Sequence, residues 1–312
     1  MKKKNIIIVG HSGFVGQSLY KNLDKKNNKI ILISRKIKKN KINEFSFDVF
    51  KNFSWFKFLK NETTIFFLAF NNNLYELEKK NYVNEIKKFS EKFNNYVKDK
   101  KLNVNFIFTS TVTIFGKTSR KMLVNEKFKD KPLSNYDRSK KIFEDIFLKY
   151  EKQNKIKFVS LRLSNIYGAN FSSEQVNRGF LNKLISNIYE KKKIILFGTG
   201  NNLRDYLYID DLIKALTISS KKINKLSGKI FIICSNKSYS FVDLVKFISK
   251  LIKQEIKIKK ITYPKYLNDI EKRSFRGSSK LFQNKTGWKP NIQLKSGIMK
   301  VFSIIKKNKI NI

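Results

Sequence analysis

Short apolar runs alternate with amphipathic stretches through the first half of the chain. Nearly continuous apolar runs are typical of strands buried on both faces of a parallel sheet. Such runs occur at residues 5–10, 29–34, 64–69, 105–110 and 157–163. Between them the apolar residues recur at helical spacing, which predicts helices at about residues 13–23, 83–97 and 137–150. Strand and helix in alternation predict right-handed βαβ units, and therefore an α/β fold with a doubly wound parallel sheet.

The regular alternation weakens after Gly168. Helical patterns at about residues 176–191, 210–220 and 241–252 are mixed there with isolated short strands. We therefore expect a larger α/β domain over residues 1–167 and a smaller α/β portion over residues 168–312. Part of the segment 206–236 is expected to pack back onto the larger domain.

Three glycines follow the first predicted strand directly and lead into the first predicted helix. Gly10, Gly13 and Gly16 have the spacing G-x-x-G-x-x-G, a variant of the dinucleotide-binding fingerprint. Such glycines allow a tight turn, a close approach of the backbone to a pyrophosphate, and close packing of helix on strand. The helix N-terminus adds N–H groups and a positive dipole end. The loop is therefore predicted to bind the phosphates of a dinucleotide.

Basic residues follow the second predicted strand. Arg35 lies about 20 residues past the glycines, where an acidic residue would bind the ribose 2′-hydroxyl of NAD. Ser34, Arg35 and Lys36 suit the 2′-phosphate of NADP instead, so NADP is the expected cofactor and NAD the alternative. Farther along, Val49 and Asp48 are candidate adenine contacts, although Asp48 could equally cap a loop.

A tyrosine and a lysine begin the third predicted helix. Tyr136 and Lys140 lie one turn apart on one helix face. A tyrosine with its usual pKa of about 10 is a poor base near neutral pH, but a nearby ammonium favours the phenolate and lowers that pKa. Tyr136 could then exchange a proton with a substrate hydroxyl or carbonyl. Thr111, or Ser110 as an alternative, would end the preceding strand with a hydroxyl aimed into the ligand crevice.

Taken together and in this order, the motifs resemble the extended short-chain dehydrogenase/reductase family, and most closely its sugar-nucleotide epimerase/dehydratase/reductase branch. The likeness continues through residues 161–168, 196–200, 203–211 and 286–290, so it covers nearly the whole chain. It implies a Rossmann domain over residues 1–167, a sugar-nucleotide-binding portion over residues 168–312, and a homodimer. It also implies an enzyme that transfers a hydride and uses Tyr136 as its acid/base.

The resemblance also implies roles for individual residues. The expected catalytic residues are Tyr136, Lys140 and Thr111, and the expected substrate contacts are Ser110, Thr111, Asn165, Arg204 and Arg273. The cofactor contacts expected from the motifs and the resemblance together are Gly10, Ser12, Gly13, Phe14, Val15, Gly16, Ser34, Arg35, Lys36, Asp48, Val49, Ala69, Tyr136 and Lys140. For Arg204, which would meet the nucleotide diphosphate, the alternative is a surface ion pair with Asp205. No metal site is expected.

Departures from the family pattern narrow the expected reaction. Members that dehydrate at C4–C6 carry Asp-Glu directly after the strand-end Thr, where this chain has Val112 and Thr113. Members that epimerise at C3 and C5 use a Cys and a His, but the only His here is His11 in the glycine loop and the only Cys is the distant Cys234. Two reactions remain. We favour 4-keto reduction, because NADPH usually drives biosynthetic reduction, over an NAD-dependent 4-epimerase.

The net charge of +43 is the most unusual bulk property of the chain. The lysines are spread along the whole chain and accompany an excess of Asn, Ile and Phe, which is the bias of an AT-rich coding sequence. We expect a solvated surface that attracts an anionic substrate. An RNA- or polyanion-binding protein and a redox-sensing regulator, both built on the cofactor fold, are alternatives of another class. The single Cys, the short N-terminal segment before the first strand and the lack of an 18-residue apolar stretch predict a cytoplasmic protein without a membrane span.

Overall fold

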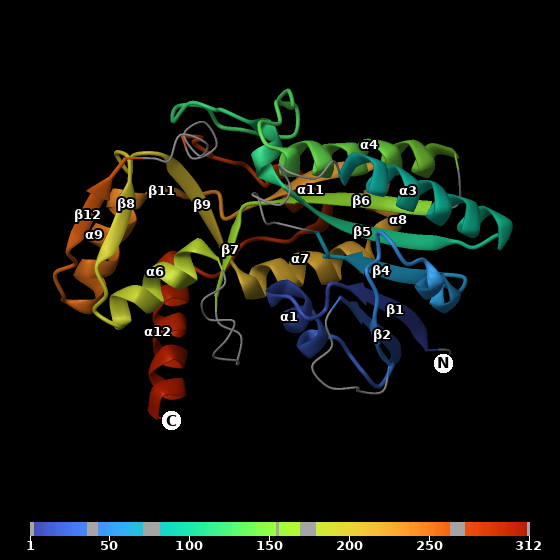
Figure 1. Ribbon diagram of the computed structural model, residues 1–312, viewed down its shortest axis with the longest axis horizontal. Coiled ribbons are helices and arrows are strands. Elements are labelled where there is room, and N and C mark those ends of the chain that lie inside the picture. The colour runs from blue at the N-terminus through green and yellow to red at the C-terminus, as the bar shows by residue number, and fades with distance from the viewer. Residues whose placement is uncertain are drawn as a thin grey trace. The chain divides into compact units, whose positions relative to one another are not determined.

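The computed structural model describes residues 3–35, 43–70, 82–153, 156–168, 179–262 and 272–310. Its main feature is a seven-stranded sheet of the Rossmann type with the strand order β10-β6-β5-β4-β1-β2-β3 (Figure 1). The strands are β1 (Lys4–Val9), β2 (Asn28–Ser34), β3 (Glu44–Ser46), β4 (Thr63–Phe67), β5 (Val104–Thr111), β6 (Ile156–Leu163) and β10 (Lys229–Ile233). β1 pairs in parallel with both β2 and β4. β2 also pairs in parallel with β3, and β4 pairs in parallel with β5. The predicted α/β fold class is confirmed.

The chain divides into two compact units. The first comprises Met1–Ile114, Pro132–Arg162 and Ile213–Phe231, and the second comprises Phe115–Lys131, Leu163–Leu212 and Ile232–Ile312. Helices within or mostly within the first unit are α1 (Phe14–Asn22), α3 (Tyr82–Asp99), α4 (Asn135–Gln153), α7 (Ile209–Lys221) and α8 (Ile223–Leu226). Short 3-10 helices span Ser54–Phe58 and Val112–Phe115.

The second unit contains two small sheets. One has the strand order β11-β9-β7, formed by β11 (Ser238–Ser240), β9 (Leu203–Tyr208) and β7 (Asn165–Tyr167). The other pairs β12 (Ile258–Ile261) in parallel with β8 (Ile194–Phe197). The helices of the second unit are α6 (Phe180–Tyr189), α9 (Phe241–Ile252), α11 (Lys280–Thr286) and α12 (Leu294–Ile310).

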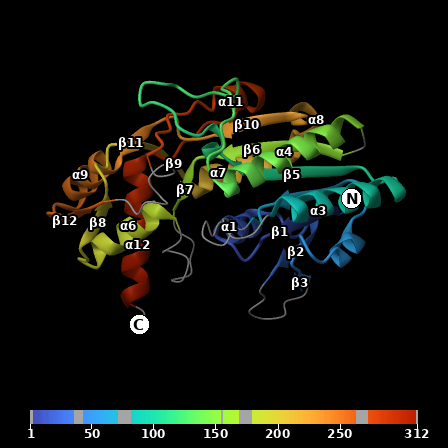
Figure 2. The same cartoon turned by 45° about the horizontal axis from the view of Figure 1, so that its top comes forward.

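An aromatic core fixes α4 on the sheet of the first unit. The ring of Phe108 in β5 lies 4.3 Å from that of Phe143 in α4, and the ring of Phe106 lies 4.6 Å from that of Phe147. All four side chains are completely buried. Figure 2 shows α3 and α4 side by side along the sheet. Burying one Phe contributes about 1.5–3 kcal/mol, so this face holds α4 firmly against β5.

The apolar runs of the first half predict the central strands to within two residues at each end. Two strands of the sheet, β3 and β10, were not predicted as strands. The predicted helix at 176–191 corresponds to α6, although residues 176–178 lie outside the described residues. In the part of the chain that the structure describes, no helix combines the length and the apolar character that a membrane crossing needs.

α12 was not predicted, and a glycine inside it explains why. Gly297 interrupts the apolar pattern of this segment, and glycine weakens a helix prediction. A Cβ at Gly297 would lie 2.8 Å from Cζ of Tyr167, so the glycine makes room for that buried ring. Tertiary packing therefore outweighs the low helix propensity at this position.

Candidate functional site

The loop between β1 and α1 needs its glycines for steric reasons. Gly10 has a φ of +91°, a conformation that favours glycine, and its N–H donates to the carbonyl of Ile33 at 2.7 Å. A Cβ at Gly16 would clash with the carbonyl oxygen of Gly10 and lie 2.5 Å from Cα of His11. The first and third glycines thus let α1 start directly against the loop.

The start of α1 fits a phosphate group. Its N-cap is Gly13, which has no side chain to accept a hydrogen bond from the first turn, and that turn contains no acidic residue. Such a helix end favours an anion through its N–H groups and its dipole. Ala69 lies against the same loop, because a Cβ at Gly10 would be 2.8 Å from the Ala69 nitrogen. The other expected contacts in this segment are Ser12, Phe14 and Val15.

The carboxyl end of β2 carries the residues expected to choose between NAD and NADP. Ser34 is the last residue of the strand and is buried, whereas the Arg35 side chain is exposed. The carbonyl of Arg35 accepts a hydrogen bond from Ser46 Oγ at 2.9 Å, which holds this end of the strand against β3. Lys36 lies outside the described residues.

β3 brings the acidic residue Glu44 to this edge of the sheet. The sequence analysis predicted neither this strand nor a role for Glu44. Glu44 pairs with Leu32 of β2, and its Oε1 lies 2.5 Å from Nε2 of His11 in the glycine loop. Both side chains are about nine-tenths buried. The alternation of polar and apolar residues from Glu44 onward is a period-2 signal that could have predicted this short strand.

Asp48 makes the loop-capping contact that the sequence left open. Its carboxylate accepts a hydrogen bond from the N–H of Phe50 at 3.3 Å, and its carbonyl accepts one from Asn52 at 2.7 Å. Val49 is buried, with an exposed fraction of 4%. An adenine contact by either residue stays a prediction.

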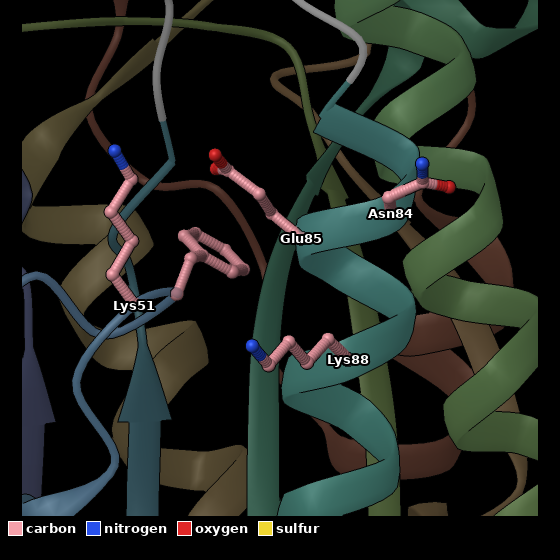
Figure 3. A pocket seen from close by; sticks show the side chains of 5 residues that line it. Lys51, Asn84, Glu85 and Lys88 are labelled. Carbon is pink, nitrogen blue, oxygen red and sulfur yellow. The ribbon is translucent and has the colours of Figure 1, made fainter.

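A small pocket lies next to this loop in the first unit. Its volume is about 290 Å³ (Figure 3). The lining residues are Phe50 and Lys51 from the loop after β3, and Asn84, Glu85 and Lys88 from α3. Because Phe50 and Lys51 directly follow Val49, the pocket adjoins the segment expected to meet the adenine.

Lys140 is buried at the end of β5. Its Nζ donates to the carbonyl of Thr109 at 2.6 Å, and it lies 4.2 Å and 4.6 Å from the ring centroids of Phe70 and Phe108. Only 3% of the side chain surface of Lys140 is exposed. Burial lowers the pKa of Lys140 to about 7, while the carboxylate of Glu144 acts in the opposite direction. The group can therefore change its charge near neutral pH.

Tyr136 lies one turn before Lys140 in α4. Its ring centroid is 5.7 Å from the Lys140 Nζ. The ring packs edge-on against that of Phe70, with 6.0 Å between the two centroids. Burial and the neighbouring charge of Asp137 raise the pKa of the Tyr136 phenol, so the predicted lowering of this pKa by Lys140 is wrong. The neutral phenol is therefore favoured, which suits a group that gives a proton to a carbonyl oxygen.

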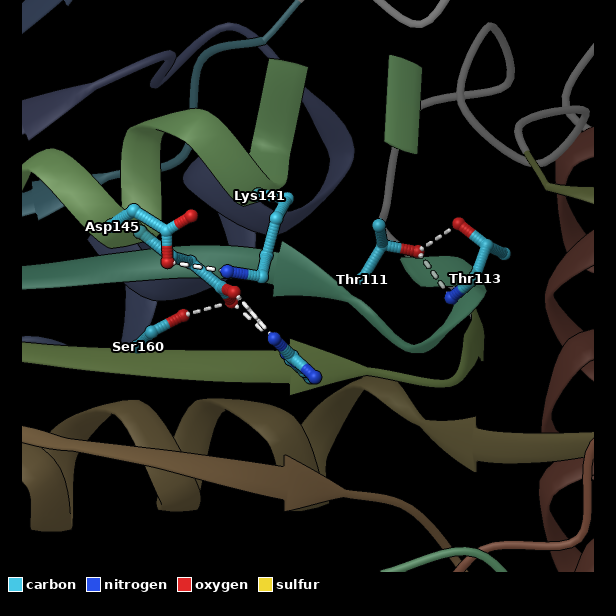
Figure 4. A network of polar contacts seen from close by, with 7 residues as sticks. Thr111, Thr113, Lys141, Asp145 and Ser160 are labelled. Carbon is cyan, nitrogen blue, oxygen red and sulfur yellow. Dashed lines mark hydrogen bonds and ion pairs between the residues drawn. The ribbon is translucent and has the colours of Figure 1, made fainter. Parts of the chain in front are cut away.

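Thr111, the last residue of β5, joins a chain of hydrogen bonds. Its Oγ1 lies 2.9 Å from that of Thr113 and accepts from the Thr113 N–H at 3.2 Å (Figure 4). The Thr113 hydroxyl in turn donates to the carboxylate of the fully buried Asp137. Ser110, the alternative hydroxyl, is buried, and its Oγ has no hydrogen-bond partner among the described residues.

The sequence analysis did not assign Thr113 or Asp137 to the site. The backbone N–H of Ser134 donates to Asp137 Oδ2 at 3.1 Å, and the Asp137 N–H donates to Ser134 Oγ at 3.1 Å. This reciprocal pair is a capping box at the start of α4. The Ser-x-x-Asp spacing before the helix could have predicted the box, but not the contact with Thr113.

The second unit holds the remaining predicted substrate residues. Asn165 in β7 is exposed, and its Nδ2 donates to the carbonyl of Asp205 at 3.1 Å. Arg204 in β9 donates through Nη1 to the carbonyl of Leu203 at 3.1 Å and also to the carbonyl of Arg273. The fold therefore brings Arg204 and Arg273 together, although they are far apart in the chain.

Asp205 is not the surface partner of Arg204 that the sequence offered as an alternative. It is completely buried and accepts hydrogen bonds from the Ser164 hydroxyl at 2.7 Å and from the N–H and hydroxyl of Ser235 at 2.8 and 2.9 Å. Burial raises the pKa of Asp205 to about 6, although these hydrogen bonds oppose the shift. The alternative prediction, a surface ion pair between Arg204 and Asp205, is therefore wrong.

Known proteins with similar sequences and structures complete the description. The chain is 30% identical to an uncharacterized protein of Schizosaccharomyces pombe over 64% of its own length, and it spans only 60% of that relative. It is 27% identical to a dTDP-D-glucose 4,6-dehydratase of Dictyostelium discoideum, over 98% of this chain and 82% of that protein. The UDP-glucose 4-epimerase of Thermotoga maritima, solved with UDP-glucose, shares the fold, with a TM-score of 0.81 at 19% identity over 98% of this chain and 99% of that one. The sequence model of the NAD dependent epimerase/dehydratase family matches residues 6–234, which is most of the chain, and the protein belongs to that family.

Proposed function

We propose that this protein is an NAD(P)-dependent oxidoreductase that reduces a 4-keto group on a nucleotide-activated sugar. One observation carries the proposal. The hydrogen bond from Lys140 Nζ to the carbonyl of Thr109 joins the helix that bears Tyr136 to the strand that ends in Thr111. A proton donor, a cation and a hydroxyl thus lie at the carboxyl ends of a parallel sheet, where ligands of such folds bind.

Tyr136 is the proposed acid/base at the substrate oxygen. Its raised pKa keeps the phenol protonated, so it can give a proton to the C4 carbonyl oxygen. When it carries its proton, Lys140 stabilises the phenolate that remains, and Thr111 binds the same substrate oxygen once it has become a hydroxyl. When bound, NAD(P) would supply or accept the hydride at C4.

The glycine loop is the proposed site of the cofactor pyrophosphate. The steric need for Gly10 and Gly16 and the glycine N-cap of α1 support this assignment. The exposed Arg35, with Lys36 beyond it in the chain, favours the 2′-phosphate of NADP. NADP in turn favours reduction, because NADPH drives most biosynthetic reductions.

The proposed substrate contacts in the second unit are Arg204, Arg273 and Asn165. Two arginines suit a nucleotide diphosphate, since a guanidinium forms paired hydrogen bonds with phosphate oxygens. The net charge of +43 would speed the arrival of such an anion. We propose that residues 1–167 bind the cofactor and residues 168–312 the sugar nucleotide.

Two other family reactions have little support in these residues. Dehydration at C4–C6 needs an acid/base pair after Thr111, but Val112 and Thr113 occupy those positions. Epimerisation at C3 and C5 needs a Cys and a His. Here His11 is bound to Glu44, and Cys234 is fully buried in an environment that raises its thiol pKa well above the usual value.

A 4-epimerase is the second candidate, and Glu44 is the observation that favours it. This carboxylate lies on the strand next to β2, close to the position where family folds bind the ribose 2′-hydroxyl of NAD. An epimerase keeps its nicotinamide bound, since it takes a hydride from a sugar and returns it to the same sugar.

The test uses the purified protein with a panel of UDP-, dTDP-, CDP- and GDP-linked 4-keto sugars. We expect NADPH to be consumed in proportion to the reduced sugar, measured by absorbance and by product analysis. Tightly held NAD, with two sugars interconverted and no net use of cofactor, would establish the epimerase instead. No turnover with any sugar nucleotide would overturn both candidates.

A further inference from the structure

The contacts behind Thr111 have a consequence for the substrate that it can bind. We infer that Asp137, acting through Thr113, sets the direction of the hydrogen bonds at Thr111, so that Thr111 accepts a hydrogen bond from a substrate hydroxyl. Asp137 and Thr113 are then positioning residues that favour the alcohol form of the sugar over its 4-keto form. The inference rests on the proposed role of Thr111 at the C4 oxygen.

The direction follows from counting protons. A carboxylate can only accept hydrogen bonds, and each threonine hydroxyl has one proton to give. The Thr113 proton goes to Asp137, so in the 2.9 Å contact between the two hydroxyls Thr111 must be the donor. Thr111 Oγ1 also accepts from the Thr113 N–H at 3.2 Å, which leaves one lone pair for a donor from outside (Figure 4).

The capping box keeps the carboxylate in place. One oxygen of Asp137 accepts from the backbone N–H groups of Ser134 at 3.1 Å and Leu133 at 3.4 Å, and the other accepts from Thr113. A purely structural cap would use only the first oxygen. Contact with both fixes the side chain and gives the hydrogen-bond chain its direction.

This direction separates the two oxidation states of the sugar. A hydroxyl at C4 can donate to Thr111, whereas a carbonyl has no proton to donate and gains nothing from Thr111 while the direction holds. In a reduction, bound NAD(P)H would give a hydride to C4 and Tyr136 would give its proton to the oxygen. Thr111 can then accept a hydrogen bond from the hydroxyl that results. The arrangement therefore stabilises the product of reduction relative to its precursor.

Asp137→Asn is the variant that tests the inference. The Asn carbonyl oxygen can keep the capping box, while its NH₂ group faces Thr113 and donates to it, so that the Thr113 proton turns toward Thr111. The Thr111 proton is then available to a carbonyl. We would measure, by calorimetry, the Kd of dTDP-6-deoxyglucose and of its 4-keto form, or of the UDP or CDP pair that the wild type binds best. The wild type should prefer the alcohol, and Asp137→Asn should shift the ratio of the two Kd values toward the ketone by about 10-fold.

Thr113 supplies the matched controls, because its substitution keeps the hydrogen bonds between Ser134 and Asp137 that form the cap. Thr113→Val should abolish the preference without reversing it, and Thr113→Ser should restore it. If Asp137→Asn does not fold, Thr113→Val and Thr113→Ser decide the question. A wild type that prefers the ketone, or a ratio that no variant changes in a protein that still binds and turns over its sugar, would overturn this inference alone. Failure of the wild type to bind any sugar nucleotide would overturn the proposed function and this inference with it.

Discussion

Lys140 in the first unit and Asp205 in the second are both fully buried ionisable groups, but their surroundings differ. Lys140 lies over aromatic rings and donates to a backbone carbonyl, whereas Asp205 is surrounded by serine hydroxyl and backbone donors. Burial moves both toward the neutral form, to a pKa of about 7 for Lys140 and about 6 for Asp205. Loss of solvation therefore outweighs the charge of Glu144 at Lys140 and the local hydrogen bonds at Asp205.

Lys140 and Asp205 differ in the residues that surround them. Lys140 is one turn from Tyr136, so in the proposed mechanism its charge affects proton transfer. Asp205 fixes β9 through Ser164 and Ser235, and this strand also carries Arg204, a cation that stays charged at any working pH. This difference agrees with the proposal that the first unit carries out proton transfer and that the second binds an anion.

Tyr136→Phe should give the largest effect, because it removes the proton donor with little change of shape. Turnover should fall by roughly 100-fold or more. The Kd for the cofactor and the thermal midpoint should stay close to those of the wild type, as measured by fluorescence titration and calorimetry. Wild-type rates in this variant would refute the assignment of proton transfer to the first unit.

Arg204→Gln should affect the proposed binding of the anion by the second unit. If its guanidinium holds the diphosphate, the KM for the sugar nucleotide should rise about 10- to 100-fold with little change in kcat, since a hydrogen bond to a charged group contributes about 1.5–3 kcal/mol. Arg138→Gln is the control, because Arg138 is an exposed arginine of α4 that bonds to Asn135. A fall in kcat without a change in KM would contradict the division of roles.

Arg35→Asp should change the cofactor preference by roughly 10-fold in favour of NADH, because a carboxylate repels the 2′-phosphate and binds the free hydroxyl. The measurement is kcat/KM for NADPH and NADH. Lys29→Asp makes the same change of charge at the other, exposed end of β2 and should leave the preference unchanged. An equal effect of both variants would show that bulk charge, not this position, selects the cofactor.

The last expected effect is on stability and not on activity, and it tests the comparison of Lys140 with Asp205 directly. Between pH 7 and 9 the unfolded chain binds the Lys140 proton and the folded chain does not, so the free energy of unfolding should rise with pH; above pH 9 the buried Cys234 thiol opposes this rise. Between pH 3.8 and 6 the folded chain binds the Asp205 proton and the unfolded chain does not, so the free energy should fall. Each slope is at most about 1.4 kcal/mol per pH unit.

Urea unfolding across pH, followed by circular dichroism, measures both slopes. Lys140→Met should remove the rise above pH 7 and leave the lower range unchanged, and Asp205→Asn should remove only the fall below pH 6. Slopes that persist in both variants would mean that other groups cause the pH dependence.

The sequence by itself determined the features that are local in the chain. The alternation of apolar runs and helical patterns specified the central strands, α1, α3 and α4, because buried strands and amphipathic helices leave periods that can be read directly. The glycine loop and the Tyr136–Lys140 spacing were equally local, since each lies within a few residues of one strand end or one helix turn. The family followed from the order of these motifs.

Only the tertiary structure decided which side chains meet across elements. Glu44 reaches His11 because β3 pairs with β2, Thr113 reaches Asp137 because the end of β5 lies beside the start of α4, and Arg204 meets the backbone of Arg273 across 69 positions of chain. Burial likewise decided that Asp205 is an internal carboxyl and not a surface ion-pair partner. These contacts depend on strand register and on the packing of separate elements, and neither leaves a fixed spacing in the sequence.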